Sequence, residues 1–158
     1  MENNKARPGA FQRRPFTGYD DQTLFEEDIA FVEGTYMCNH PWKTPKSYVM
    51  EIERQWREEG SEKIASAFRG RNKQEAEKLM IYYASRYIQA MSWAEGKPVT
   101  SLENIAGVLS ESVCAPVNLQ ERLSYVLASP SHHQSFTVLD QLFAESRKKW
   151  AVYFMKMQ

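Results

Sequence analysis

The sequence lacks the short motifs by which many enzymes are recognised. No Gly-x-Gly occurs among its 158 residues, so neither a dinucleotide-binding loop nor a kinase-type glycine loop is present, and the Walker spacing is missing as well. No Glu is followed three residues later by His, the motif of helical di-metal carboxylate sites. His-Glu-x-x-His and Gly-x-Ser-x-Gly do not occur either. We therefore expect a non-enzymatic protein without a cofactor.

Cysteine, glycine and proline are also scarce. The two cysteines, Cys38 and Cys114, cannot form a disulfide framework, and reduced thiols are expected. Seven Gly and seven Pro are too few for a sandwich of many short strands. No apolar run approaches the length of a membrane span, and the first residues are polar and charged, unlike a secretory signal. These features predict a cytoplasmic protein with no membrane partner.

The chain has no net charge, but its charges are segregated. The 20 basic and 20 acidic residues cancel, which leaves no overall attraction to nucleic acid. Residues 1–16 are mainly basic, residues 17–42 carry acids and no base, and the chain from Ser146 onward carries Arg147, Lys148, Lys149 and Lys156 with no acid. Two interpretations follow: the segments neutralise one another within one fold, or a basic arm reaches a polyanion.

Apolar residues recur at helical spacing, and no segment alternates convincingly with period two. This pattern predicts an all-α protein, a compact bundle of about six or seven helices. It forms a single domain over residues 18–158, preceded by a flexible basic arm over residues 1–17. The longest helix is expected at residues 73–94, where apolar residues cover more than one face, and this helix and the one at residues 135–155 are expected at the centre. The other helices are expected at residues 21–32, 45–59, 61–69, 100–110, 118–128 and 135–155.

Capping residues mark the expected helix boundaries. Thr44 before Pro45 is a typical helix start, and so is Asn72 three residues before Glu75. Asn118, followed three residues later by a Glu, predicts a reciprocally capped start, and Gly60 predicts a break in the chain. Further caps and stops are expected at Thr23, Thr100, Gly34, Gly70 and Gly96.

Two groups of residues are candidates for binding. Aromatic and arginine side chains concentrate binding energy at protein interfaces, and the arm offers four of them, Phe11, Arg13, Arg14 and Phe16. Basic residues beside a helix N-terminus favour phosphate, which makes a second, weaker set of Arg69, Arg71, Lys73, Lys148 and Lys149. Lys148 and Lys149 also have a structural interpretation, because the end of a helix favours cations.

Cysteine and histidine residues are present, but their spacing does not favour a zinc site. Cys38 and His40 are two residues apart, and Cys114 with His132 or His133 could complete four ligands. Structural zinc sites usually present paired ligands at tighter, repeated spacing. Buried thiols and surface histidines are the simpler interpretation, so no metal is expected.

The remaining clusters are interpreted as structural. Aromatic residues surround Arg86 at helical spacing and could stack on bases, but in such an apolar helix we expect them in the core. Ser131 to Ser135, with two histidines between them, is interpreted as a solvated loop and helix start rather than a catalytic pair. The acids Glu26, Glu27 and Asp28 stand near a helix start, where the helix dipole favours negative charge.

The last third of the chain resembles a known family. Residues 116–127 (PVNLQERLSYVL) and 139–149 (LDQLFAESRKK) are similar to the C-terminal part of the YpoC-like proteins of Bacillus and related bacteria, mainly over residues 114–156. The resemblance implies a helical, cytoplasmic protein without an assigned activity. It also implies a gene near replication-initiation and base-excision-repair genes, and it defines no catalytic residues.

Two hypotheses for the function follow. The first is an interaction or regulatory protein that engages a protein partner. The alternative is a nucleic-acid-associated protein that binds through the basic arm and the C-terminal basic residues, which predicts strong salt dependence. The oligomeric state stays open, because the surplus of aromatic residues suits either a core or a dimer face.

Overall fold

The fold is all-α, as the sequence predicts. A computed structural model describes residues 7–18, 24–35 and 40–157, and within these ranges it contains seven α-helices and no strand. The helices are α1 (Glu26–Val32), α2 (Pro45–Gln55), α3 (Ser61–Arg69), α4 (Lys73–Ala94), α5 (Ile105–Leu109), α6 (Leu119–Ala128) and α7 (His133–Lys156). Short 3-10 turns lie at Gly9–Phe11, Phe16–Gly18 and Pro41–Lys43.

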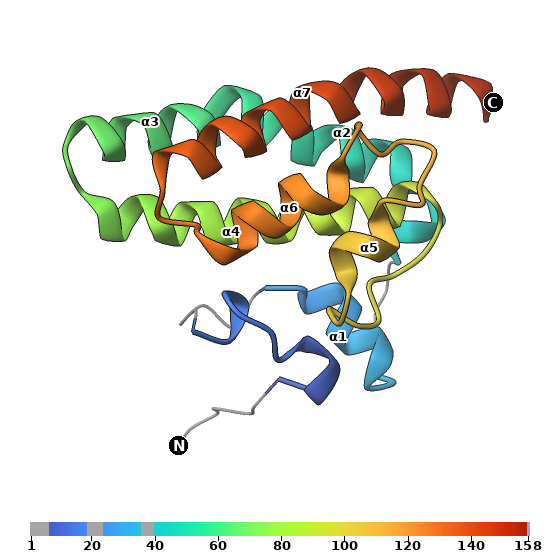
Figure 1. The fold of residues 1–158 in the computed structure, drawn as a ribbon. Coiled ribbons are helices and arrows are strands. Elements are labelled where there is room, and N and C mark those ends of the chain that lie inside the picture. Colours follow the sequence, from blue (N-terminus) through green and yellow to red (C-terminus); the bar gives the residue numbers. More distant parts are fainter. Residues whose placement is uncertain (1–6, 19–23, 36–39, 158) are drawn as a thin grey trace.

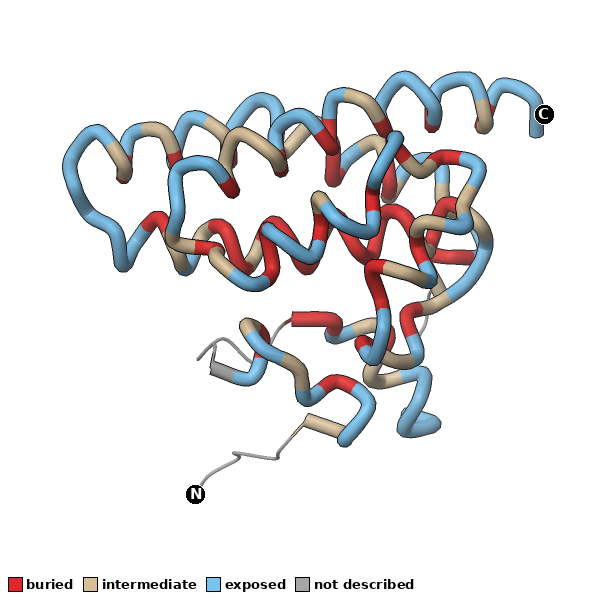
Figure 2. Tube along the Cα trace, viewed as in Figure 1, coloured by how far each residue is buried: buried red, intermediate tan, exposed pale blue. Residues whose placement is uncertain are grey.

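Helix α4 is the central element, which confirms its predicted place. It contacts α2, α3, α5, α6 and α7, and its residues are buried on several sides (Figure 2). In Figure 1, α2, α3 and α7 lie along one side of α4, and α1 with the N-terminal segment lies on the other. Helix α7, predicted at the centre as well, buries one face only, and its C-terminal end projects beyond the bundle. It has 24 residues against 22 in α4, so the prediction of α4 as the longest helix is wrong.

Aromatic rings join the helical turn that follows α2 (Trp56–Gly60) to α4 and α7. The Trp56 ring stacks on Phe143 with centroids 4.8 Å apart, and the Tyr87 ring meets Phe143 edge-on at 5.0 Å. The indole Nε1 of Trp56 donates a hydrogen bond to Asp140 Oδ1 at 3.0 Å, so its one polar group is satisfied. These three elements therefore share one core.

The predicted break at Gly60 is wrong. The chain stays helical from α2 through a π-helical turn, η4 (Trp56–Gly60), and directly into α3. Gly60 has ordinary helical angles, φ −64° and ψ −46°. A Cβ at this position would lie 2.5 Å from Cζ of Tyr83, closer than carbon atoms can approach. Glycine is therefore required because the Tyr83 ring packs against the helix backbone, and it does not end the helix.

The predicted helix starts are only partly confirmed. α2 begins at Pro45, and Asn72 Oδ1 accepts a hydrogen bond from Glu75 N at 3.2 Å at the start of α4. Asn118 precedes α6, but its φ of 59° is left-handed and its side chain makes no capping bond. A side-chain cap needs an extended backbone, which explains the failure of the capping-box prediction there. The cap predicted at Thr23 lies outside the described residues.

The predicted flexible arm is wrong for residues 7–17. Phe11 and Phe16 have exposed fractions of 0%, and both rings lie against Phe25, with centroid distances of 5.8 and 5.2 Å. The backbone joins the bundle as well, since Leu102 N donates to Ala10 O at 2.7 Å. Burial of two aromatic side chains outweighs the entropy of ordering this short segment. Residues 1–6 lie outside the described residues.

Replacing Phe16 by Ala tests whether the N-terminal segment packs against the bundle. We expect the free energy of unfolding to fall by about 3–5 kcal/mol, because a buried ring leaves a cavity in the core. Urea denaturation followed by circular dichroism measures the loss. Arg14→Ala serves as the control two residues away, since Arg14 is exposed and its loss is expected to change stability by less than about 0.5 kcal/mol. Equal unfolding midpoints for wild type and Phe16→Ala would contradict the burial.

Candidate functional site

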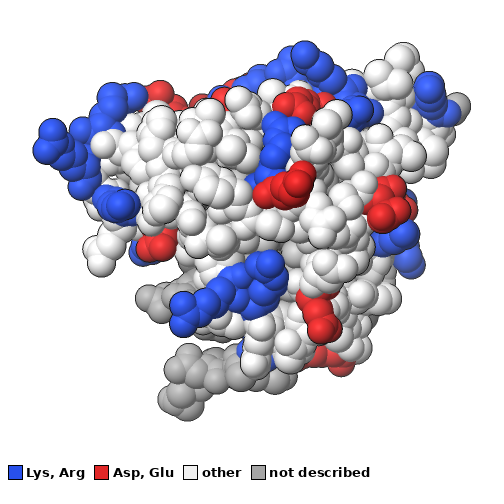
Figure 3. All heavy atoms as spheres, in the orientation of Figure 1, with Lys and Arg blue, Asp and Glu red and all other residues white. Residues whose placement is uncertain are grey.

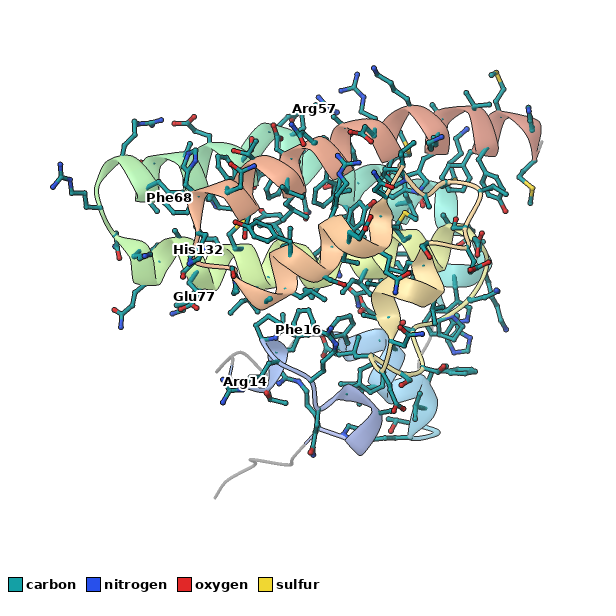
Figure 4. All side chains as sticks on the ribbon, in the orientation of Figure 1. Arg14, Phe16, Arg57, Phe68, Glu77 and His132 are labelled. Atoms are coloured by element: carbon teal, nitrogen blue, oxygen red, sulfur yellow. The ribbon has the colours of Figure 1, made fainter. Side chains whose placement is uncertain are left out.

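The partner-binding set predicted in the arm is not brought together at the surface. In Figure 4 Phe16 points toward α4, while Arg14 points outward. Phe11 and Phe16 are fully buried, whereas Arg13 is half-buried and Arg14 exposed. The aromatic anchors of this set are therefore part of the core. Alternating aromatic and basic residues look alike in a sequence, whether the rings face a partner or the chain's own interior.

The candidate phosphate-binding residues fall into two separate groups. Arg69, Arg71 and Lys73 lie where α3 meets α4, close to the beginning of α7, whose His133 ring is 5.0 Å from that of Phe68. Lys148 lies fifteen residues further along α7, which corresponds to about 22 Å of helix. Arg69 is also engaged, since its Nη2 lies 2.8 Å from Glu62 Oε2.

The residues weighed for a metal site do not converge among the described part of the chain. Cys38 lies outside the described residues, and the His40 ring stacks on Trp42 at 5.0 Å. Cys114 is buried, and burial raises the pKa of its thiol to about 11. Within residues 7–18, 24–35 and 40–157, no group of three or more potential ligands is close enough to hold a metal ion.

A buried carboxylate lies between α1 and α4. Asp28 of α1 has an exposed fraction of 0%. Its Oδ1 accepts hydrogen bonds from Trp93 Nε1 at 2.9 Å and from Val99 N at 2.6 Å, and its Oδ2 accepts one from Gln89 Nε2 at 2.7 Å. Arg86 Nη1 in turn donates to Gln89 Oε1 at 2.8 Å. The Gln89 amide therefore links a buried carboxylate to a guanidinium and fastens α1 to α4.

Burial dominates the protonation of Asp28. Desolvation raises the pKa of this carboxyl from 3.8 to about 6, although the hydrogen bonds from Trp93, Gln89 and Val99 oppose the shift. The sequence interpretation, that Asp28 only complements the helix dipole, overlooked this role. A signal was present, since Asp28 stands three residues after Phe25 and so shares its face of the helix.

A second polar contact lies in the core between α4 and α7. The hydroxyls of Tyr87 and Ser146 are 2.8 Å apart, and Ser146 Oγ also lies 3.4 Å from the carbonyl oxygen of Cys114. Burial raises the pKa of Tyr87 above its ordinary value. Tyr87 and Ser146 are both fully buried, so this contact holds the helices together and offers no surface.

The projecting end of α7 stands between two hollows. We name the first the α2–α7 groove, a hollow of about 540 Å³ lined by Thr44, Pro45, Lys46, Ser47, Met50, Ala94, Tyr153, Phe154 and Met157. The second, which we name the α7 side pocket, has a volume of about 410 Å³ and is lined by Val113, Cys114, Lys148, Lys149, Val152, Tyr153 and Lys156. Tyr153 lines both, so the last turns of α7 form a ridge between them.

This ridge exposes large apolar side chains beside lysines. Val152, Met155 and Met157 have exposed fractions of 46%, 66% and 67%. In Figure 3 the projecting end at the upper right is mainly white, with blue atoms beside it. In the part of the chain that the structure describes, four lysines and no acid line the two hollows, namely Lys46, Lys148, Lys149 and Lys156. Among the described residues, none of these four forms an ion pair.

The fold and this surface define a small all-α protein with an exposed, lysine-rimmed apolar ridge. The chain belongs to the YpoC-like protein family, whose model matches residues 46–158. It is similar to "Uncharacterized protein YpoC" of Bacillus subtilis (strain 168), with 24% identity over 113 residues, which are 72% of this chain and 68% of that protein. No solved structure matches it significantly.

The family match extends the resemblance well beyond residues 114–156, because α2, α3 and α4 are also included. Apart from Thr44 and Pro45, all residues that line the two hollows lie within the matched region. The N-terminal segment and α1 lie outside it. No helix in the described part of the chain is both long enough and apolar enough to cross a membrane.

Proposed function

We propose that the protein is a non-enzymatic interaction or regulatory module of the bacterial cytoplasm, and that it binds a protein partner at the projecting end of α7. The observation that carries this proposal is the apolar ridge of Val152, Met155 and Met157 between two hollows. Contiguous exposed apolar surface of this kind marks interaction sites in folded proteins. Methionine suits such a site because its flexible side chain adapts to the surface it meets.

The shape of the surface favours a macromolecule over a small ligand. A small molecule would fill one hollow and leave the exposed Met155 and Val152 uncovered. A protein surface can enter the α2–α7 groove and the α7 side pocket together and cover the ridge that separates them. Several neighbouring apolar contacts then lose water at once, which is how interfaces concentrate their binding energy.

Nucleic-acid binding, the alternative hypothesis, has less support from the geometry. A nucleic-acid site needs basic residues along one continuous path, because each neutralised phosphate contributes to affinity. Here the candidate residues lie at the α3–α4 connection and along the second half of α7, and the exposed Arg14 belongs to the N-terminal segment on the opposite side of α4.

Site-specific crosslinking in the host bacterium tests the proposed function. A photo-crosslinking amino acid in place of Met155 is expected to yield a discrete protein adduct. The same amino acid in place of Val117 should yield none, because Val117 is 74% exposed but lines neither hollow. Denaturing electrophoresis and mass spectrometry read the result. Equal adducts at both positions, none at Met155, or an adduct that nuclease removes would each count against a protein partner at this surface.

A further inference from the structure

We propose that the element bound at the end of α7 is an acidic amphipathic helix of the partner, with apolar side chains in both hollows and carboxylates against the four lysines. This inference rests on the proposed function and specifies the chemistry of the partner. It depends on three features of the surface: a local excess of positive charge, the absence of Asp and Glu from the described residues that line the hollows, and a groove formed by two helices.

The positive charge is local, because the whole chain is neutral. Lys46 comes from the beginning of α2, while Lys148, Lys149 and Lys156 come from α7, so two separate elements bring the four charges to one surface. Among residues 7–18, 24–35 and 40–157, no Asp or Glu lines either hollow. A surface with this charge attracts an acidic segment and speeds its association.

These lysines lack the ion pairs that other basic residues have. Glu145 would be the natural partner of Lys148 and Lys149, which lie three and four residues further along α7. Its carboxylate is already engaged, because Arg122 of α6 binds it through two nitrogens at 2.9 and 2.8 Å. This contact also lowers the pKa of Glu145. Lys148 and Lys149 also lower the pKa of Glu145 through their charge, but neither forms an ion pair with it, so both can still pair with an external carboxylate.

The charge also disfavours a second copy of this chain as the occupant. In a two-fold dimer the same surface faces itself, so eight lysines would gather at one interface, and no Asp or Glu of the described chain lines the hollows to offset them. Like charges placed opposite each other weaken association. The exposed apolar ridge alone would suit self-association, and the lysines around it decide against that.

The groove suits a helix rather than an extended strand. Strand addition needs an exposed sheet edge, and the described residues contain no strand. The α2–α7 groove has an apolar floor that includes Met50, Tyr153 and Phe154 between two helices. Amphipathic helices bind such grooves through apolar side chains at positions i, i+3, i+4 and i+7, and their outer positions can then carry the acids.

Fluorescence anisotropy of labelled peptides tests the inference on the full chain. The probe is a designed helical peptide with Leu at positions i, i+3, i+4 and i+7 and Glu on the flanking positions. One control peptide carries Lys in place of every Glu, and another is a scramble of the acidic peptide. We expect the acidic helix to bind about tenfold more tightly than either control, with an affinity that falls as salt rises.

Charge-reversed variants locate the binding. The double variant Lys148→Glu, Lys149→Glu is expected to weaken the acidic peptide about tenfold and to strengthen the basic one. The matched control Lys63→Glu, Lys78→Glu reverses two exposed lysines, one of α3 and one of α4, that line neither hollow, and it should bind like wild type. Thermal unfolding of all variants checks that they remain folded.

Each outcome separates this inference from the proposed function. Equal binding of acidic and basic peptides, or no effect of Lys148→Glu, Lys149→Glu, would overturn the acidic helix. If the Met155 crosslink still forms, the proposed binding of a protein partner at the end of α7 is still supported. Binding to phosphatidylglycerol vesicles with no binding of the acidic peptide would assign the surface to an anionic lipid instead. Absence of both the crosslink and the peptide binding would remove the proposed function as well.

Discussion

Replacing Asp28 by Ala is expected to lower the free energy of unfolding by about 3 kcal/mol at neutral pH. The change leaves the buried donors of Trp93 and Val99 without their acceptor, and Gln89 Nε2 keeps only its longer hydrogen bond to Glu27 Oε1 at 3.3 Å. The free energy lost with these hydrogen bonds is larger than the desolvation cost that is saved when the buried carboxylate is removed. Urea denaturation of the wild type and the variant measures the difference. Glu26→Ala is the control, because Glu26 lies in the same helical turn but is exposed.

The same variant has a characteristic pH dependence. The pKa of Asp28 is raised from 3.8 to about 6 in the folded chain, so the folded state binds the proton more tightly than the unfolded state. Proton binding by Asp28 stabilises the fold by about 3 kcal/mol below about pH 4, where this contribution is fully present. The contribution is lost as pH rises through about 6. The stability deficit of Asp28→Ala should therefore be larger at about pH 4.5 than at about pH 7.5.

A deficit that grows as pH rises would contradict this prediction. It would mean that the three donors stabilise the charged carboxylate more than burial destabilises it, and that the pKa of Asp28 is lowered. A deficit no larger than that of Glu26→Ala would contradict the network itself.

Replacing Gly60 by Ala is expected to destabilise the protein by about 1–3 kcal/mol, although Ala is the better helix former. The added methyl group would lie 2.5 Å from Cζ and 2.6 Å from Cε2 of Tyr83, so the ring must move within a packed core. Thermal unfolding monitored by circular dichroism detects the loss. Gly70→Ala is a matched control, because the nearest atom to its Cβ is 3.5 Å away, an ordinary contact.

A double-mutant cycle identifies the cause. With Tyr83 replaced by Ala, the space beside Gly60 opens, and Gly60→Ala should no longer destabilise the chain. If Gly60→Ala costs the same in both backgrounds, the close approach of the ring is not the reason. A Gly60→Ala variant as stable as the wild type would contradict the packing of α2, η4 and α3 against α4.

Where boundaries depend on local chemistry, the sequence predicts the fold well. α3 and α4 occupy the predicted residues 61–69 and 73–94, because capping and helical periodicity act within a few neighbouring residues. Gly60 shows the limit of this approach. A glycine that ends a helix and one that admits a ring from another helix look identical in a sequence, and Tyr83 is 23 residues away.

The polar interior was harder to predict for the same reason. Asp28 makes all three of its hydrogen bonds with residues more than 60 positions further along the chain. The candidate surface at α7 was predicted only in part. The sequence indicates Lys148 and Lys149 as basic candidates. It does not indicate Lys46, because the packing of α2 against α7 that brings Lys46 to the same surface follows from no local pattern.

The N-terminal segment and α1 bear on whether the region matched by the family model could fold without them. The family match begins at residue 46, yet Phe11, Phe16 and Phe25 are fully buried and belong to the same core as α4. The matched region is therefore not a self-sufficient module in this protein. Grafted alone onto another chain, it would expose the apolar face that residues 7–18 and 24–32 now cover. A relative without a matching N-terminal segment would therefore have to cover this apolar face in another way.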